Sequence, residues 1–186
     1  MPIAASLPPA QSDQFHAAHG FPPIANDQAR LLILGSMPGI ASLRVGQYYA
    51  HPRNQFWLIM AALLERDLIA LPYPERVQSL IDARIALWDV LQSCQRPGSL
   101  DADIAPDSII ANDFAPFFAR HPGISHVFFN GATAEQQFKQ RVQARIALPH
   151  LHTQRLPSTS PAHAALTFPA KLKAWHSVAE VLEQTG

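Results

Sequence analysis

The fold of this chain is indicated first by a ten-residue stretch, RLLILGSMPG (residues 30–39). It contains four consecutive apolar residues, Leu31, Leu32, Ile33 and Leu34, and then changes abruptly to glycine, serine and proline. A short continuous apolar run that is closed by Gly and Pro is typical of a buried parallel strand running into a loop. The stretch therefore predicts an inner strand of a parallel sheet, followed by a loop that could belong to a functional site.

Strand and helix patterns alternate along the rest of the chain. Strands are predicted at 31–34, 85–91, 126–129 and 153–156, and helices at 54–66, 74–81, 112–120, 132–141 and 171–184. Such alternation implies right-handed crossovers and a parallel sheet with helices on both faces, so we expect an α/β fold. Ligands of such sheets bind at the carboxyl ends of the strands, which are here GSMPG, WDVLQS, NGATA and PSTSPAH.

Length and composition favour one globular domain. The chain has 186 residues, of which 48% are hydrophobic and 15% charged. Residues 1–29 are rich in Pro and Ala and are predicted to form an N-terminal arm packed on the body, with residues 30–186 as the single domain. No apolar run approaches the ~20 residues of a membrane helix, and no secretory signal is recognised. We therefore expect a cytoplasmic protein without membrane contact.

Cysteine and histidine usage gives no metal signature. Cys94 is the only cysteine, so it can form no internal disulfide and cannot hold an iron–sulfur cluster by itself. The nine histidines form no HxxxH or HExxH pattern, and His150 and His152 are interpreted as a surface pair. The loop after the first strand also lacks the GxxxxGK and GxGxxG patterns of nucleotide-cofactor sites. We expect no metal.

The formal net charge is zero. This counts against a protein that coats nucleic acid nonspecifically, because such proteins carry a large basic excess. A DNA enzyme is still compatible with the composition, since backbone amides, helix N-termini and a few local Lys and Arg residues can hold phosphates. Any affinity for DNA should then depend only modestly on salt.

Two segments carry side chains suited to an extruded nucleobase. In QYYAHPRNQFW (residues 47–57), Tyr48 and Tyr49 offer stacking faces, and Arg53 and Asn54 offer hydrogen bonds, whereas Trp57 is interpreted as helix core. In PSTSPAH (residues 157–163), three hydroxyls could grip a DNA phosphate.

A serine hydrolase is a weaker alternative. It would pair Ser36 or Ser158 with His163. The chain has no GxSxG turn, and no acid is in an obvious position to orient the histidine.

Three blocks carry a specific resemblance: GSMPGIASLRVGQYYAHPRNQFW (residues 35–57), HVFFNGATAEQQF (residues 126–138) and LPSTSPAHA (residues 156–164). They resemble, in order, the motifs of the hypoxanthine-DNA glycosylase family within the uracil-DNA glycosylase superfamily. The resemblance implies a three-layer α/β/α sandwich around a four-stranded parallel sheet. It also implies a monofunctional glycosylase without metal or cofactor that acts on deaminated bases in DNA.

The sequence departs from other branches of that superfamily at two positions. Met37 stands where they carry Asp or Asn, and Leu156 stands where the classical branch carries His. Methionine can neither orient a water nor act as a base. By resemblance to the hypoxanthine branch, the catalytic role falls to Asn54, and Asp89 matches the base-reading Asn of the second strand. A structural role for Asp89 stays open.

These assignments define a predicted site. The base pocket comprises Gly35, Ser36, Met37, Pro38, Gly39, Tyr48, Tyr49, Phe56, Asp89 and Asn130. The surface for the DNA backbone, or for the gap left by the base, comprises Ser42, His51, Arg53, Ser158, Thr159, Ser160, Pro161 and His163. The expected partner is DNA with a damaged base, bound by a monomer. Two alternatives remain: a glycosylase for uracil or an oxidised pyrimidine, and a noncatalytic nucleic-acid or nucleotide-binding module.

A mechanism follows from these residues. Breaking the N-glycosidic bond leaves positive charge on the sugar and negative charge on the base. Backbone amides of residues 36–39 would stabilise the departing base, and the Asn54 carbonyl would orient a water that attacks late, because an amide is not a useful base. Asp89 would accept from N1–H of hypoxanthine, a group that adenine lacks. Without a lysine nucleophile, no lyase activity is expected.

Overall fold

The computed structural model describes residues 16–148 and 150–184. Most of the predicted arm, residues 1–15, therefore lies outside the described residues. No helix within the described ranges is both long and apolar enough to cross a lipid bilayer.

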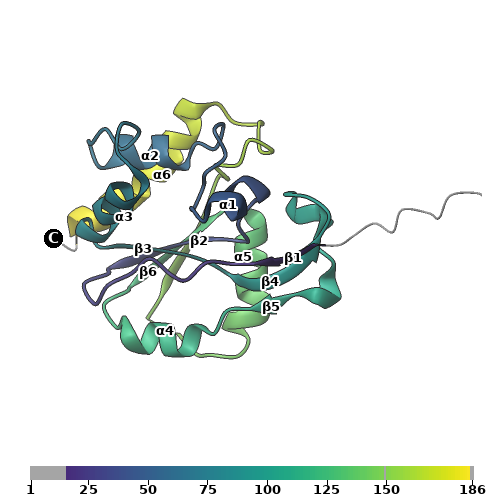
Figure 1. The fold of residues 1–186 in the computed structure, drawn as a ribbon. Helices are drawn as coiled ribbons and strands as arrows, with labels where there is room; N and C mark the ends of the chain where they lie inside the picture. Colours follow the sequence, from purple (N-terminus) through teal and green to yellow (C-terminus); the bar gives the residue numbers. More distant parts are fainter. Residues whose placement is uncertain (1–15, 149, 185–186) are drawn as a thin grey trace, which may run out of the picture.

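The centre of the molecule is a four-stranded parallel sheet (Figure 1). Its strands are β2 (Leu31–Gly35), β3 (Ile85–Asp89), β6 (His126–Asn130) and β7 (His152–Leu156), in the order β3-β2-β6-β7. All five residues of β2 are buried, as its continuous apolar run predicts. Because the strands are parallel and in register, their carboxyl ends meet at one edge of the sheet.

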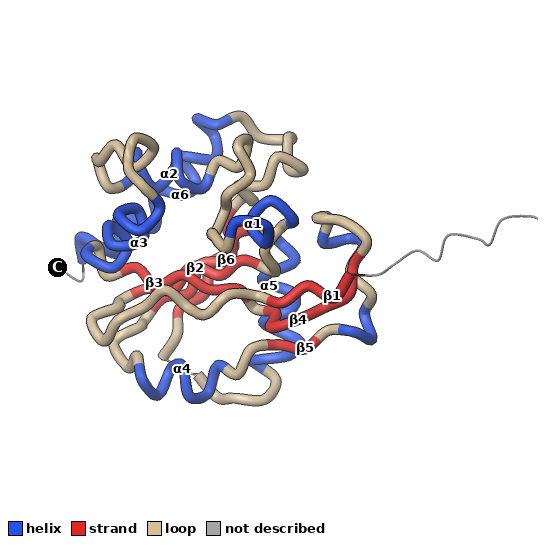
Figure 2. The backbone as a smooth tube through the Cα atoms, in the orientation of Figure 1, coloured by secondary structure: helices blue, strands red, loops and turns tan. Residues whose placement is uncertain are grey.

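Helices cover both faces of this sheet (Figure 2). The helices α2 (Phe56–Leu63), α3 (Tyr73–Asp82) and α6 (Phe168–Gln184) pack against one face, through a core that includes Ile33 of β2.

The opposite face is covered by α4 (Phe114–Arg120) and α5 (Ala132–Phe138), in a core that includes Leu32 and Leu34. Alternate residues of β2 thus feed two separate cores, as strand geometry requires. The predicted three-layer α/β/α fold is confirmed.

A second sheet, which the sequence analysis did not predict, lies beside the first. It is antiparallel and consists of β1 (His16–His19), β4 (Leu91–Arg96) and β5 (Ile110–Ala111), with β4 in the middle. The predicted strand 85–91 is therefore divided. Its first part belongs to the parallel sheet, and after Val90 the chain continues as β4 in the other sheet.

The described part of the arm, residues 16–29, runs along the body of the molecule. Ile24 pairs with Leu87 of β3 as an isolated antiparallel bridge. The indole Nε1 of Trp88 donates to the carbonyl of Phe21 over 3.0 Å. These contacts place the segment against β3 and close to the site described below.

Several helix boundaries differ from the predicted ones. A short helix, α1 (Ile40–Val45), follows the first loop and was not predicted. Helix α2 begins at Phe56 because the Asn54 side chain accepts the Phe56 N–H over 2.9 Å and keeps Asn54 itself outside the helix. The last part of the predicted helix 132–141 widens into a π-helical turn, Lys139–Gln143.

Candidate active site

A cavity of about 390 Å³ opens at the carboxyl edge of the parallel sheet. All four strand-end loops contribute to its wall. Most of the predicted site residues line it: Gly35, Ser36, Met37, Pro38, Gly39, Ser42, Tyr48, Tyr49, His51, Asn54, Asp89, Asn130, Ser158, Thr159, Ser160, Pro161 and His163. Phe56 and Arg53 do not line it.

Asp89 closes the inner end of this cavity. Its side chain is buried, and its Oδ2 atom has no hydrogen-bond partner among the described residues. Burial raises its pKa to about 7; the nearby Asp101 adds to this rise and Arg96 opposes it. A buried and unpaired acceptor of this kind is suited to a ligand that brings its own donor.

Gly35 allows the side chains at the inner end to come together. A Cβ atom at this position would lie 2.3 Å from Oδ1 of Asp89 and 3.0 Å from the Tyr49 hydroxyl. No side chain fits there without moving one of them. Glycine at the end of β2 is therefore required for the close approach of Asp89 and Tyr49.

The two adjacent tyrosines have different roles. Tyr48 is buried, and its hydroxyl donates to the carbonyl of Pro22 over 3.2 Å, which ties it to the arm. Tyr49 adopts the left-handed backbone region, with φ of 55°, and its ring stacks on Phe56 at 4.0 Å between centroids. Phe56 is fully buried and supports Tyr49 from behind. Of these two rings, Tyr49 lines the cavity and Phe56 does not.

Asn54 lies in the turn before α2 and lines the cavity. Its Oδ1 atom accepts the Phe56 N–H, and its own N–H donates to the carbonyl of His51 over 2.8 Å. An amide oxygen has two lone pairs, so one remains to accept from a water. The Nδ2 group makes no hydrogen bond to another described residue. Asn54 is thus held firmly while it keeps polar groups for the cavity.

The last strand-end loop is fastened by Thr159. Thr159 is fully buried, its N–H donates to Asn130 Oδ1 over 2.8 Å, and its hydroxyl accepts from Asn130 Nδ2 over 2.9 Å. Its carbonyl accepts the N–H of Gln55 over 3.0 Å. The Thr159 side chain is therefore committed to holding the loop, which leaves Ser158 and Ser160 as its partly exposed hydroxyls.

The two hydrogen bonds between Asn130 and Thr159 lead to a prediction about stability. Asn130→Ala leaves the buried N–H and hydroxyl of Thr159 without partners, so we expect the free energy of unfolding to fall by about 2–4 kcal/mol. Urea unfolding followed by circular dichroism measures the change. Asn130→Asp keeps the acceptor for the Thr159 N–H and should lose clearly less. Equal losses in the two variants would contradict this role.

Two other predicted residues have local structural partners, and a third lies outside the cavity wall. Ser42 is buried, and its hydroxyl accepts the Ala50 N–H over 3.1 Å, so it fixes the end of the segment that carries the two tyrosines. Arg53 is exposed beside the cavity, outside its wall. The carbonyl of His163 accepts a 2.8 Å hydrogen bond from Nζ of the buried Lys171, which anchors the end of the last loop to α6.

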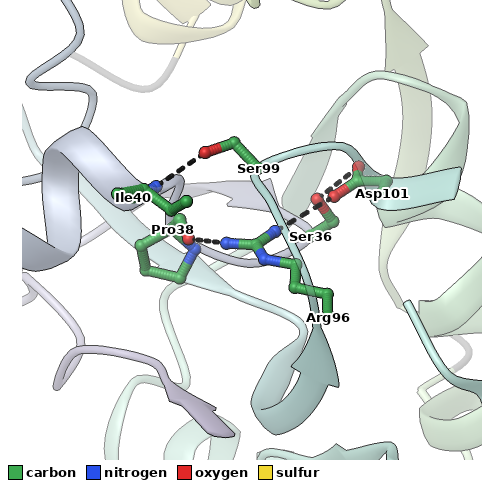
Figure 3. Close-up of polar contacts among 6 residues, drawn as sticks. All are labelled: Ser36, Pro38, Ile40, Arg96, Ser99 and Asp101. Atoms are coloured by element: carbon green, nitrogen blue, oxygen red, sulfur yellow. Dashed lines mark hydrogen bonds and ion pairs between the residues drawn. The ribbon is translucent and has the colours of Figure 1, made fainter. Parts of the chain in front are cut away.

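The sequence analysis missed one part of the wall, the segment that follows β4. Ser99, Leu100, Asp101 and Ala102 line the cavity, together with Thr133 of α5. Ser36 Oγ donates to Oδ2 of Asp101 over 2.7 Å, and the carbonyl of Pro38 accepts from the buried Arg96 (Figure 3). No local pattern in the stretch RPGSLD (residues 96–101) links it to the first loop.

The geometry disfavours the serine hydrolase alternative. The Ser36 hydroxyl hydrogen is donated to Asp101, and Ser158 Oγ accepts the N–H of Ser160 over 3.2 Å. Within the described ranges, neither serine is hydrogen-bonded to the imidazole of His163. The nucleophile–base pair that such an enzyme needs is therefore not formed. No group of three or more potential metal-ligating side chains occurs within residues 16–148 and 150–184.

Comparison with protein families agrees with this architecture. A model of the uracil DNA glycosylase superfamily matches residues 22–179, which is most of the chain. The chain belongs to this superfamily. The resemblance found in the three sequence blocks is thereby confirmed.

Relatives of this superfamily member occur in Methanosarcina. Two curated proteins named hypoxanthine DNA glycosylase are similar to it. The one from Methanosarcina barkeri (strain Fusaro / DSM 804) is 38% identical over 112 residues, or 60% of this chain and 70% of the relative. The one from Methanosarcina acetivorans is 36% identical over 115 residues, or 62% and 72%.

A solved structure has the same fold. It is a solution NMR structure from Methanosarcina acetivorans, described as a candidate uracil DNA glycosylase. It superposes with a TM-score of 0.76 at 30% identity and covers 90% of this chain and 99% of its own. The second sheet and the segment after β4 are thus parts of a chain that matches a superfamily structure over nearly its whole length.

Proposed function

We propose that this protein is a monofunctional DNA glycosylase that hydrolyses the N-glycosidic bond of a flipped, deaminated base, with hypoxanthine as the preferred base. The single observation that carries the proposal is the cavity at the four strand ends, which combines Asn54 in its wall with the buried, unpaired Asp89 at its inner end. Membership in the superfamily supports the activity, and the names of the two curated relatives support the base.

The proposed reaction begins when the base leaves the duplex and enters the cavity. Extrusion costs a few kcal/mol, and less for a weakly paired lesion. The base then stacks on Tyr49, whose ring is backed by Phe56. The N1–H group of hypoxanthine donates to Asp89, which accepts best when it is ionised.

Bond cleavage needs stabilisation of both charges that develop. The N–H groups of Met37 and Gly39 donate to no other group in the described part of the chain, so they remain available for the departing base anion. The cationic sugar is stabilised by the DNA phosphates beside it. A water held by Oδ1 of Asn54 then attacks the sugar and releases a proton, which neutralises the departed base anion directly or through solvent, so that the products are the free base and an abasic site. Because an amide does not deprotonate water, bond breaking runs ahead of attack.

Tyr49 offers a test of the binding step. Tyr49→Ala removes the stacking face, and base–aromatic stacking contributes about 1–3 kcal/mol per base. We therefore expect affinity for a deoxyinosine duplex to fall by one to two orders of magnitude, with a smaller effect on undamaged DNA. Fluorescence anisotropy of labelled duplexes measures both. Phe56 stays buried in the variant, and a melting curve checks that its packing survives.

The experiment that tests the function is a panel of duplexes, each with one modified base. Alkaline cleavage after incubation at low salt reports abasic sites. We expect strand breaks with deoxyinosine, fewer with uracil, and none before alkali, since no lyase step is proposed. Cleavage that is fastest with uracil or an oxidised pyrimidine would move the substrate to that base. Binding without any abasic site would establish a noncatalytic binder.

The proposal includes DNA with a damaged base as partner, and a monomer in the cytoplasm as the acting form. A monomer suffices because every group used above comes from one chain.

A further inference from the structure

The Ser36 hydroxyl is held in one orientation by Asp101. Its Oγ donates to Oδ2 of Asp101 over 2.7 Å, and both residues line the cavity. A hydroxyl has a single hydrogen and two acceptor lone pairs. Once the hydrogen points at Asp101, the oxygen can only accept a hydrogen bond from a bound base.

Asp101 is itself fixed by its surroundings (Figure 3). Nη1 of Arg96 lies 3.7 Å from its Oδ1, and the Arg96 side chain is 1% exposed against 32% for Asp101. The same segment is tied to the first loop a second time, because Ser99 Oγ accepts the Ile40 N–H over 2.8 Å.

Ionisation of Asp101 is governed by opposing influences. The pKa of its carboxyl group is raised, because the effect of burial exceeds the lowering by the hydrogen bond from Ser36 and by the charge of Arg96. The positive charge of the Arg96 guanidinium beside Oδ1 favours the ionised form of this carboxyl group, which can only accept.

Deamination changes the ring nitrogen that can form a hydrogen bond with a fixed acceptor. It turns an exocyclic amine into a carbonyl and turns the neighbouring ring nitrogen from an acceptor into an N–H donor. Hypoxanthine and uracil carry this donor, whereas adenine and cytosine present a lone pair there. Ser36 Oγ and the Asp89 carboxyl group line the same cavity, so the one ring N–H of such a base can be shared between them, whereas a ring lone pair in that place faces acceptors and is repelled.

We infer that Asp101 is a positioning residue for base selection: by holding the Ser36 hydroxyl as an acceptor, it makes the cavity selective for bases with a ring N–H donor over adenine and cytosine. The inference rests on the proposed function and extends it, because it names the substrate class and a residue that enforces it. Asp101 acts through Ser36 and need not touch the base.

The decisive variant is Asp101→Asn. Arg96 can only donate, so it should bind the amide oxygen and turn the amide NH₂ toward Ser36. The Ser36 hydroxyl would then accept from residue 101 and be free to donate to the ring nitrogen of adenine. We expect the ratio of affinities for free hypoxanthine and free adenine to fall by about tenfold or more, as for one mismatched hydrogen bond in a closed site. Chemical-shift titration of isotope-labelled protein with each base measures the ratio.

Two further variants separate this role from a structural one. Asp103→Asn removes an exposed carboxylate two residues away and should leave the ratio unchanged. Ser36→Ala keeps the Arg96–Asp101 pair and should also lower the ratio. It therefore tests the inference even if Asp101→Asn does not fold. Adding Asp101→Asn to Ser36→Ala should then change the ratio by less than about threefold, because the mediating hydroxyl is gone.

The affinity ratios for free bases test the inference without any measurement of catalysis. An unchanged ratio in Ser36→Ala, or an equal fall in both affinities in Asp101→Asn, overturns it. So does an undiminished effect of Asp101→Asn in the Ser36→Ala background. Excision of deoxyinosine by the wild-type protein is assayed separately. Preference for free hypoxanthine without excision would reject the proposed function and leave this inference standing.

Discussion

Replacing Asn54 with alanine should lower the single-turnover rate of deoxyinosine excision by about 10²–10³-fold, the usual loss when one preorganised polar group is removed from a reaction centre. The variant loses the oxygen that would hold the water, while Tyr49 and Asp89 remain to bind the base. Affinity for the lesion duplex should therefore change little. Single-turnover kinetics together with anisotropy titration separates the two quantities.

A control is needed because Asn54 also serves α2. Its Oδ1 accepts the Phe56 N–H, so the alanine variant should lose about 0.5–2 kcal/mol of stability as well. Asn54→Asp retains this acceptor and can still hold a water. We expect it to keep the stability and most of the rate. Wild-type excision by Asn54→Ala would remove Asn54 from the mechanism, and equal inactivity of the two variants would show that the side-chain oxygen alone does not account for its role.

Asp89→Asn should make the protein more stable above neutral pH. The pKa of Asp89 is raised to about 7 in the folded protein, whereas an exposed aspartate has a pKa of about 3.9. Between these values the folded state holds a proton that the unfolded chain has released. The free energy of unfolding of the wild type therefore falls as pH rises from about 4 to 7, and the loss is complete above pH 7.

The asparagine variant has no such dependence, so the two proteins should differ little near pH 4. Their difference should grow to at most about 4 kcal/mol in favour of the variant above pH 7. Urea unfolding at several pH values measures it. Asp103→Asn, with its exposed side chain, is the matched control and should follow the wild type. Stability curves of Asp89→Asn and wild type that run parallel would show that Asp89 is not buried in the way described.

The same titration predicts the pH dependence of function. An ionised Asp89 accepts from N1–H, so the preference for deoxyinosine over deoxyadenosine should increase as pH rises through about 7. Asp89→Asn should lose the pH dependence and weaken the preference, while the Ser36 hydroxyl still accepts. If the Asp89 carboxylate serves binding at a cost in stability, Asp89→Asn should gain stability and lose selectivity.

Local patterns were enough to predict the parallel sheet and most of the cavity. The continuous apolar run of β2 reflects burial on both faces of the sheet. The loops after β2 and β7 are marked by proline and small polar residues, and the turn after β6 is marked by asparagine and glycine. Asn54 and Asp89 were found through resemblance to a family, not through periodicity. The prediction that both lie at one cavity agrees with its lining.

The parts that were missed depend on contacts between distant segments. Ser36 and Asp101 are 65 positions apart, and no local pattern in RPGSLD shows that its carboxylate meets the first loop. The sheet of β1, β4 and β5 was missed because its strands are short and half-polar, and because the apolar residues Val90 and Leu91 extend the pattern of the preceding strand. Phe56 was placed in the pocket from its neighbours in sequence, whereas helix phase turns it into the core.

The loops at the mouth of the cavity are braced against one another: Gln55 and Asn130 both bind Thr159, and Asp101 binds Ser36. A cavity whose loops are already fixed to one another can close only slightly around a nucleotide, so closure contributes little to extruding that nucleotide from the duplex. Extrusion then depends largely on how stable the base pair is in the DNA itself. Turnover should accordingly depend on which base lies opposite the lesion, even if no side chain ever reads that base.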